Sequence, residues 1–246
     1  MKLHVLAIGA HPDDVELGCA GTLLNHIKKG QSVGILDLTA GELGSRGTAE
    51  TRKAEAAAAS KIMGLTVRQN LQLPDGFFTY DKESVLKVVQ AIRLYQPDII
   101  LANAPTDRHP DHGHGSTLVR DAAFLSGLIK IETTYNGEKQ SPWRPKRVFH
   151  YIQDRYIEPD FIVDVTDVHD VKLEAIKAYT TQFYQGTDVS TESVKTYISG
   201  ANFLDGIIAR ASLFGKRIGV KYGEGFVSEN VVGINDLDQL IYPDIA

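Results

Sequence analysis

The chain has 246 residues, of which 43% are hydrophobic and 23% charged, and its formal net charge is −5 at pH 7. This composition is that of a globular protein with a sizeable core, without the basic stripe that nucleic acid needs or the run of roughly 20 apolar residues that a bilayer needs. Cys19 is the single cysteine, which excludes an internal disulfide, and no signal-peptide pattern opens the chain, so we expect a cytoplasmic protein without nucleic-acid or membrane partners.

Strand and helix patterns alternate through the first half of the chain. Branched apolar residues favour strands, apolar residues at helical spacing favour helices, and Gly30 and Gly64 stand where two helices should end. A glycine-rich loop (41–50) precedes the second helix. The expected elements are, in order, a strand (3–9), a helix (18–29), a strand (32–39), an alanine-rich helix (51–64), a short strand (66–73), a helix (84–96), a strand (98–104) and a helix (116–129).

The pattern loosens after about residue 130. A turn-rich stretch (134–147) is followed by two expected strands (147–152 and 160–165), a helix (168–183) and a further helix within 192–219. The regular alternation before this point predicts an α/β fold with a mostly parallel, Rossmann-like sheet flanked by helices. No change in composition marks a linker. We therefore expect a single domain over residues 1–246, with a C-terminal elaboration.

Two polar clusters stand directly after two of the expected strands. The stretch "AHPDD" (10–14) follows the first strand, and "DRHPDHGH" (107–114) follows the strand over 98–104. Both should meet at one edge, because ligands of open α/β sheets bind at the carboxyl ends of the strands. Imidazole plus carboxylate is a normal ligand set for a catalytic zinc, and a cation would offset the repulsion between adjacent carboxylates. The side chains available to such a metal site are His11, Asp13, Asp14, His109, Asp111, His112 and His114.

The motifs resemble those of a known family. The "AHPDD" stretch, paired with "HPDH" (109–112), is similar to the LmbE/PIG-L family of zinc-dependent deacetylases, and the resemblance extends to "GELGSRGTAETRKAEA" (41–56) and "KYGEGF" (221–226). It covers most of the chain. Within the family, "GELGSRG", "LPDGF" (73–77) and "YGEGF" most resemble the bacillithiol-biosynthesis branch, whose members deacetylate N-acetylglucosaminyl-malate. The resemblance also implies a homo-oligomer, either a trimer or a hexamer.

The resemblance assigns roles to individual residues. It implies that His11, Asp14 and His112 are the metal ligands, that Asp13 is the general base, that His109 stabilises the oxyanion or acts as an acid, and that Arg52 binds substrate. The planar fork of Arg52 suits a carboxylate such as that of malate. Asp111 is expected to orient a ligand histidine. Zn²⁺ is the expected cofactor, although such ligands also accept Fe²⁺ and other divalent metals.

Several alternatives stay open from the sequence. The substrate is a malate conjugate or another N-acetylglucosamine derivative, such as a chitooligosaccharide or a thiol conjugate. A non-catalytic metal-binding module and a nucleotide-binding Rossmann protein are the rival classes, and the missing glycine fingerprint counts against the latter. Glu224 is compatible with the site, a subunit contact or a surface loop. The roles of His114, Arg46 and Arg108 are likewise open, and Cys19 is expected to be a small buried residue.

Overall fold

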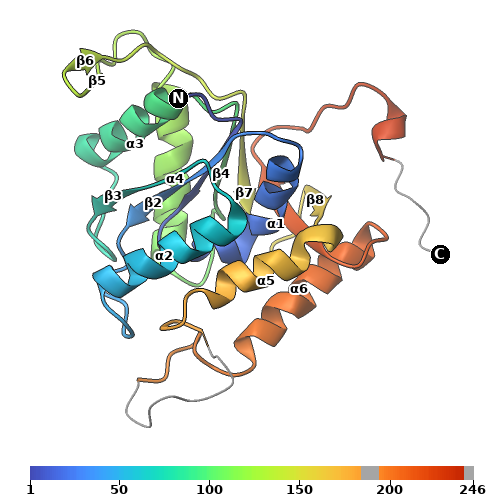
Figure 1. The fold of residues 1–246 in the computed structure, drawn as a ribbon. Coiled ribbons are helices and arrows are strands. Elements are labelled where there is room, and N and C mark those ends of the chain that lie inside the picture. Colours follow the sequence, from blue (N-terminus) through green and yellow to red (C-terminus); the bar gives the residue numbers. More distant parts are fainter. Residues whose placement is uncertain (184–193, 241–246) are drawn as a thin grey trace.

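The computed structural model describes residues 1–183 and 194–240. A seven-stranded sheet carries the fold, in the order β3-β2-β1-β4-β7-β9-β8 (Figure 1). The elements are β1 (Val5–Gly9), α1 (Asp14–Lys28), β2 (Val33–Thr39), α2 (Ala49–Met63), β3 (Val67–Leu73), α3 (Lys82–Tyr95), β4 (Ile99–Asn103), α4 (Pro110–Leu125), β5 (Thr134–Tyr135), β6 (Glu138–Lys139), β7 (Arg147–Tyr151), β8 (Phe161–Asp164), η1 (Thr166–Val168), α5 (His169–Lys177), α6 (Phe203–Arg217), β9 (Gly223–Ser228) and η2 (Leu237–Leu240).

The predicted fold class is confirmed. Strands β3, β2, β1, β4 and β7 pair in parallel, whereas β9 runs antiparallel to both β7 and β8. Successive side chains of a strand point to opposite faces, so Val5 and Ala7 of β1 enter one apolar cluster and Leu6 and Ile8 enter another. The first cluster packs α1, α2 and α5 on one face of the sheet, and the second packs α3 and α4 on the other.

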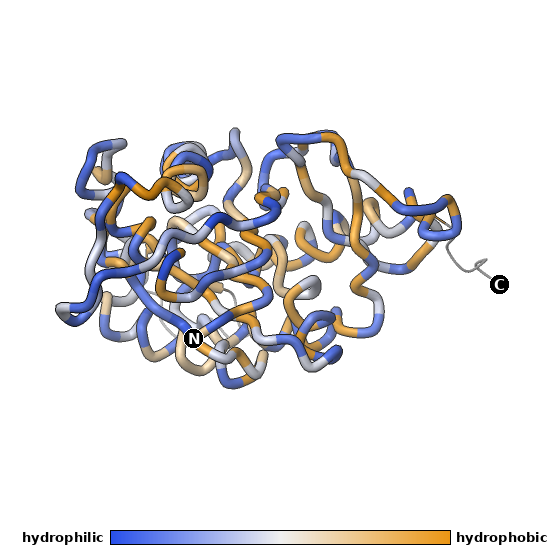
Figure 2. The backbone as a smooth tube through the Cα atoms, turned by 90° about the horizontal axis from the view of Figure 1, so that it is seen from above, coloured by the Kyte–Doolittle hydropathy of each residue, from blue (hydrophilic) through white to orange (hydrophobic). Residues whose placement is uncertain are grey.

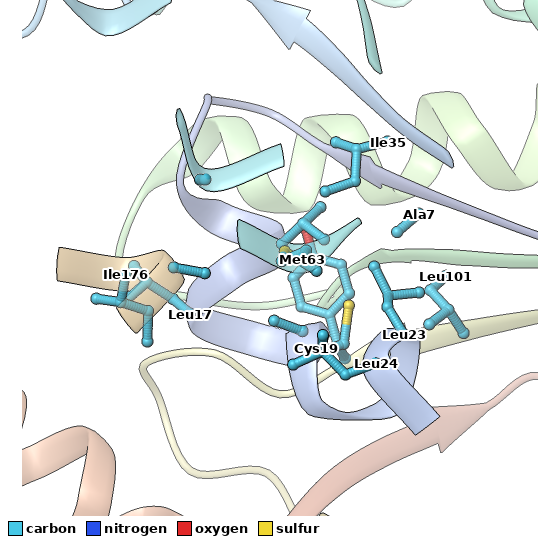
Figure 3. Close-up of a cluster of buried hydrophobic side chains, with 14 of the residues drawn as sticks. Ala7, Leu17, Cys19, Leu23, Leu24, Ile35, Met63, Leu101 and Ile176 are labelled. Atoms are coloured by element: carbon cyan, nitrogen blue, oxygen red, sulfur yellow. The ribbon is translucent and has the colours of Figure 1, made fainter. Parts of the chain in front are cut away.

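Cys19 lies inside the first apolar cluster, as expected for a small buried residue. It packs in the same group as Leu23, Leu24 and Met63 (Figure 3) and is fully buried. Burial raises the pKa of its thiol well above the usual value. A buried, protonated thiol is a poor nucleophile, so the position belongs to the core.

Two helices begin earlier than the sequence predicts. Helix α1 begins at Asp14 rather than Gly18, and α4 begins at Pro110 rather than Ser116. In α4 the proline occupies the first turn, where its missing N–H costs nothing, and His109 is the N-cap residue. The second polar cluster therefore lies partly on a helix, which fixes its side chains more firmly than a loop would.

The last part of the chain differs most from expectation. Strand β9 was not predicted, because Gly223 and Gly225 lower the strand propensity of "YGEGF". The glycines are needed there, since an added Cβ would come within 2.6 Å of Ile162 and 2.9 Å of Phe214. Helix α5 ends at Lys177 instead of reaching 183, and α6 forms within the predicted range 192–219, of which residues 192 and 193 lie outside the described residues.

The stretch after β9 extends to one side of the body (Figure 2). It carries the 3-10 turn η2 and exposes apolar side chains, with Val231 96% and Leu237 75% exposed. Within residues 1–183 and 194–240, no helix is long and apolar enough to cross a membrane.

Glu224 of β9 is a structural residue of the core. Helix α1 is interrupted at Cys19, whose backbone lies at φ −146° and ψ 16°, so the helix restarts and exposes new N–H groups. The Glu224 carboxylate accepts these donors from Gly21 at 2.9 Å and from Thr22 at 2.7 Å. Lys172 of α5 lies 2.7 Å away and balances the charge. Glu224 thus joins α1, α5 and β9 in the interior of the protein.

We predict that Glu224→Gln lowers the free energy of unfolding by about 3 kcal/mol, because it leaves the buried Lys172 ammonium without its counter-charge. Denaturant unfolding of the wild type and the variant measures the difference. Adding Lys172→Met to the variant should recover part of the loss. A change below about 1 kcal/mol for the single variant would contradict this role.

Candidate active site

The two predicted clusters meet at one edge of the sheet. Strands β1 and β4 are parallel neighbours, and with Ala7 opposite Leu101 their last residues, Gly9 and Asn103, end at the same level. The chain continues from β1 to β2 on one side and returns to β4 on the other, which makes this the topological switch point where open α/β sheets bind ligands. A hydrogen bond of 2.8 Å from Ala10 N to the Asn103 side chain ties the two loops together.

Asp14 lies between two of the histidines that the sequence selects. Its Oδ1 lies 3.1 Å from His112 Nε2, and its Oδ2 lies 3.6 Å from His11 Nδ1. Asn103 and Gln153 also donate to the carboxylate, at 3.1 and 2.7 Å. Burial favours the neutral acid, but His112 and His11 nevertheless hold the pKa of Asp14 well below its usual value. Asp14 is therefore a fixed, ionised carboxylate that faces two imidazoles.

The second nitrogen of each histidine is held by a carboxylate. His112 Nδ1 lies 2.7 Å from Asp107 Oδ2, an arrangement that turns Nε2 toward Asp14. Although burial lowers the pKa of His112, Asp14 and Asp107 raise it to about 9. His11 Nε2 lies 3.0 Å from Asp75 Oδ1 and 3.3 Å from Asp111 Oδ2. Such carboxylates orient metal-binding histidines in proteins.

Sequence reasoning missed two of these carboxylates. Asp107 opens the cluster "DRHPDHGH", and Asp75 lies within "LPDGF", so both stood in stretches that the sequence already marked. Neither has a spacing that identifies its partner histidine. Asp111, which was expected to orient a ligand histidine, lies beside His11 and accepts a hydrogen bond from Gly76 N at 2.8 Å. Its role stays a prediction.

The residues present fit a divalent metal. Nitrogens of His11, His109 and His112 lie within 4.8 Å of one another, and so do ligand atoms of His11, Asp75 and Asp111. In the described part of the chain, the buried Oδ1 of Asp111 has no hydrogen-bond partner. A buried carboxylate oxygen without a donor is expected where a cation binds. Imidazole and carboxylate ligands suit Zn²⁺ and also Fe²⁺, so the site defines a metal class and leaves the metal itself open.

Asp13 contacts a different partner from Asp14 and has an unusual backbone conformation. It is the N-cap residue of α1 and adopts φ 114°, a positive value that is uncommon outside glycine. Its Oδ2 lies 3.2 Å from Arg52 Nη1, which also donates to Pro12 O at 2.8 Å. Burial raises the pKa of Asp13 to about 7, and Arg52 opposes the rise. A carboxyl group with a pKa near neutrality suits proton transfer.

The remaining predicted residues divide between the pocket and its surroundings. A cavity of about 310 Å³ is lined by the side chains of both clusters, including Asp13, His109 and Arg52. Burial and the neighbouring histidines His11 and His112 lower the pKa of His109. Arg52 lines this cavity, and its Nη1 lies 3.2 Å from Asp13, the expected base, so its role in substrate binding stays a prediction.

Three residues with open roles now have positions. Arg108 lines the pocket, lies 2.8 Å from Asp154 and stacks over the Tyr197 ring at 4.6 Å. Arg46 donates to Thr181 O at 2.7 Å, which links the glycine-rich loop to the segment after α5. His114 is exposed and contacts Phe78 edge-on, away from the other three histidines. Among these, only Arg108 can reach a ligand in the cavity.

We predict that Asp107→Asn weakens metal binding about 10- to 100-fold, because the amide no longer fixes the His112 ring as an ionised acceptor does. Competition with a chelator measures the affinity. Asp98→Asn is a matched control, because Asp98 pairs with Lys146 beside the opposite end of β4. An unchanged affinity in Asp107→Asn would show that this carboxylate does not orient the ligand.

A Rossmann-like sheet with a buried cluster of histidines and carboxylates at its switch point defines an α/β protein with a candidate metal-dependent active site. Comparison with known proteins adds the family. Residues 6–123 match the family described as "PIG-L: GlcNAc-PI de-N-acetylase". The chain belongs to this PIG-L/LmbE family, and it is a hydrolase that acts on amide C–N bonds.

Individual relatives support the assignment. The chain is 30% identical over 199 residues to the probable N-acetyl-alpha-D-glucosaminyl L-malate deacetylase 2 of Bacillus subtilis, covering 74% of this chain and 84% of that protein. It is 29% identical over 189 residues to the diacetylchitobiose deacetylase of Thermococcus kodakarensis, covering 73% and 70%. The crystal structure of a conserved protein from Thermus thermophilus matches with a TM-score of 0.82 at 38% identity, covering 94% and 97%.

Proposed function

We propose that this hydrolase removes the N-acetyl group of N-acetyl-alpha-D-glucosaminyl L-malate, as an enzyme of bacillithiol biosynthesis in the cytoplasm. The observation that carries the reaction is the separation of two adjacent carboxylates: Asp14 faces the histidines, and Asp13 faces the pocket beside Arg52. The name of the Bacillus subtilis relative and the motifs "GELGSRG" and "LPDGF" support the malate conjugate. The name of the Thermococcus relative favours diacetylchitobiose as the second candidate.

In this proposal His11, Asp14 and His112 hold the metal, which supplies, when bound, a water of lowered pKa and a polarised amide carbonyl. Asp13 takes the proton of the attacking water and later passes a proton to the leaving amine. His109 at the pocket wall donates a hydrogen bond to the oxygen that becomes negative. Arg52 holds Asp13 through Nη1 and contacts the substrate from the same pocket wall.

Release of acetate from a panel of N-acetylglucosamine conjugates tests the proposal. The panel contains the malate conjugate, diacetylchitobiose and a methyl glycoside, each with the metal-loaded protein and with a chelator. We expect the malate conjugate to be cleaved with the highest kcat/KM and every reaction to stop with chelator. Preferred cleavage of diacetylchitobiose would select the second candidate, and full activity in excess chelator would overturn the metal-dependent mechanism.

The resemblance to the family also supports a homo-oligomer, and we propose a trimer or hexamer. Light scattering coupled to size-exclusion chromatography measures the mass of the assembly directly. A monomeric mass across the working concentration range would remove this part of the proposal without affecting the chemistry of the site.

A further inference from the structure

A second cavity opens beside the active-site pocket. It has a volume of about 560 Å³ and shares four lining residues with the first cavity: Asp154, Tyr197, Phe203 and Ile207. Helix α6 forms one wall through Phe203, Ile207 and Arg210. Because the two cavities share this wall, a ligand whose acetamido group lies near the histidines can extend its other end into the second cavity.

Arg210 gives this cavity a positive charge that no carboxylate of the described residues pairs with directly. Its side chain is half-buried, and in the described part of the chain its one hydrogen bond runs from Nη2 to Leu17 O at 3.5 Å, near the limit for such a bond. No carboxylate of the described residues lies within ion-pair distance of it. Buried arginines are normally paired, because their desolvation costs free energy that a counter-ion offsets.

Three carboxylates of the described residues attract Arg210 over a longer range, those of Asp154, Asp107 and Glu224, and each of them is engaged elsewhere. Asp154 uses Oδ2 for Arg108 at 2.8 Å and Oδ1 for the Tyr197 hydroxyl at 3.1 Å. Asp107 holds His112 through one oxygen and the backbone N–H groups of Arg108 and Arg155 through the other. The Glu224 carboxylate is taken by Lys172 and by the restart of helix α1. Among residues 1–183 and 194–240, no carboxylate is therefore left to pair directly with the Arg210 guanidinium.

Arg52 differs from Arg210 in this respect. Its guanidinium already contacts the Asp13 carboxylate and the Pro12 carbonyl, so its charge is balanced before any ligand arrives. A second anion at Arg52 would compete with the expected general base. Of the two arginines, Arg210 is thus the better receptor for an acidic group that lies beyond the sugar.

We propose that the second cavity is the subsite for the aglycone, and that Arg210 selects aglycones that carry a carboxylate. This inference rests on the proposed deacetylation of an N-acetylglucosamine conjugate, and it moves recognition of the acid from Arg52 to Arg210. The planar fork of arginine binds a carboxylate through two parallel hydrogen bonds, which gives the pocket a specific preference for acids over neutral groups of equal shape.

Equilibrium binding of the reaction product tests the subsite without turnover. Glucosaminyl-L-malate and its neutral dimethyl ester are titrated into the metal-loaded wild type and into Arg210→Gln. We expect the wild type to bind the acid at least tenfold more tightly than the ester, and Arg210→Gln to lose about 10- to 100-fold in affinity for the acid. Arg210→Lys should fall between them, since an ammonium keeps the charge but loses the fork.

Arg217→Gln is the matched control, because Arg217 lies on the same helix but does not itself line the cavity; its guanidinium bonds Glu158, which lies outside the lining, and the hydroxyl of Tyr156, which belongs to the lining. Its affinity for both ligands should match the wild type. If Arg210→Gln fails to fold, the acid-to-ester ratio of the wild type alone decides, and equal binding of both ligands overturns the proposal. Loss of acid binding in Arg217→Gln as large as in Arg210→Gln would also overturn it.

The binding experiment and the acetate assay fail in different ways. If the protein cleaves diacetylchitobiose and binds acid and ester equally, the deacetylase activity is supported and the role of Arg210 is rejected. If no N-acetylglucosamine conjugate releases acetate, but the wild type binds the acid more tightly than the ester and Arg210→Gln does not, the anion subsite is supported and the proposed function is rejected.

Discussion

Asp13→Asn is expected to keep the bound metal and to lose about 10³-fold in kcat, because the amide cannot accept the proton of the attacking water. The substitution preserves size, and asparagine is among the residues that tolerate the positive φ of this position. Metal content by elemental analysis and kcat from acetate release are measured on the same preparation. The free energy of unfolding is measured as well, so that a loss of fold is not mistaken for a loss of chemistry.

The neighbouring substitution Asp14→Asn is the matched control. Asp14 faces His11 and His112, whereas Asp13 contacts Arg52, so substitutions at the two adjacent residues should differ in their effect on metal content. Asp14→Asn should lose metal together with activity. An Asp13→Asn enzyme that retains more than about a tenth of the wild-type kcat would remove Asp13 as the general base. Loss of metal from both variants would instead place both carboxylates on the metal.

The location of the site was predictable from the sequence because it depends on strand order and strand ends alone. The apolar runs 3–9 and 98–104 are unambiguous, and a parallel sheet brings the ends of such strands to one edge. The separation of Asp13 from Asp14 was not predictable in the same way. It depends on the positive φ of Asp13 at the start of α1, and the sequence suggested that this helix began four residues later.

Long-range partners are where the sequence fell short. The Glu224 carboxylate accepts hydrogen bonds from Gly21 and Thr22 because α1 is interrupted at Cys19. The spacing of apolar residues in this part of the sequence does not predict that interruption. In the same way, Arg210 lies in an amphipathic helix whose spacing indicates burial but not which cavity the helix borders. Such contacts join residues about 200 positions apart, so they follow from the packed fold and not from any short motif.

His112→Ala is expected to lose the metal and, with it, more than about 10³-fold in kcat, because the site would keep too few ligands for a catalytic centre. Asp107 contacts Nδ1 of His112, and Asp14 lies beside its Nε2. Because both of these neighbours are carboxylates, neither supplies an imidazole in place of His112. Elemental analysis and chelator competition measure the metal, and acetate release measures the activity. Wild-type protein stripped by chelator should show the same loss of activity, and adding Zn²⁺ should restore it there but not in the variant.

His114→Ala separates a ligand from a nearby histidine on the same helix. His114 lies two residues after His112 but is exposed and contacts Phe78, so its removal should leave metal content and kcat within about twofold of the wild type. Full metal occupancy in His112→Ala would contradict the ligand set. A loss of metal in His114→Ala equal to that in His112→Ala would show that α4 turns a different face to the pocket, because residues two apart on a helix do not share a side.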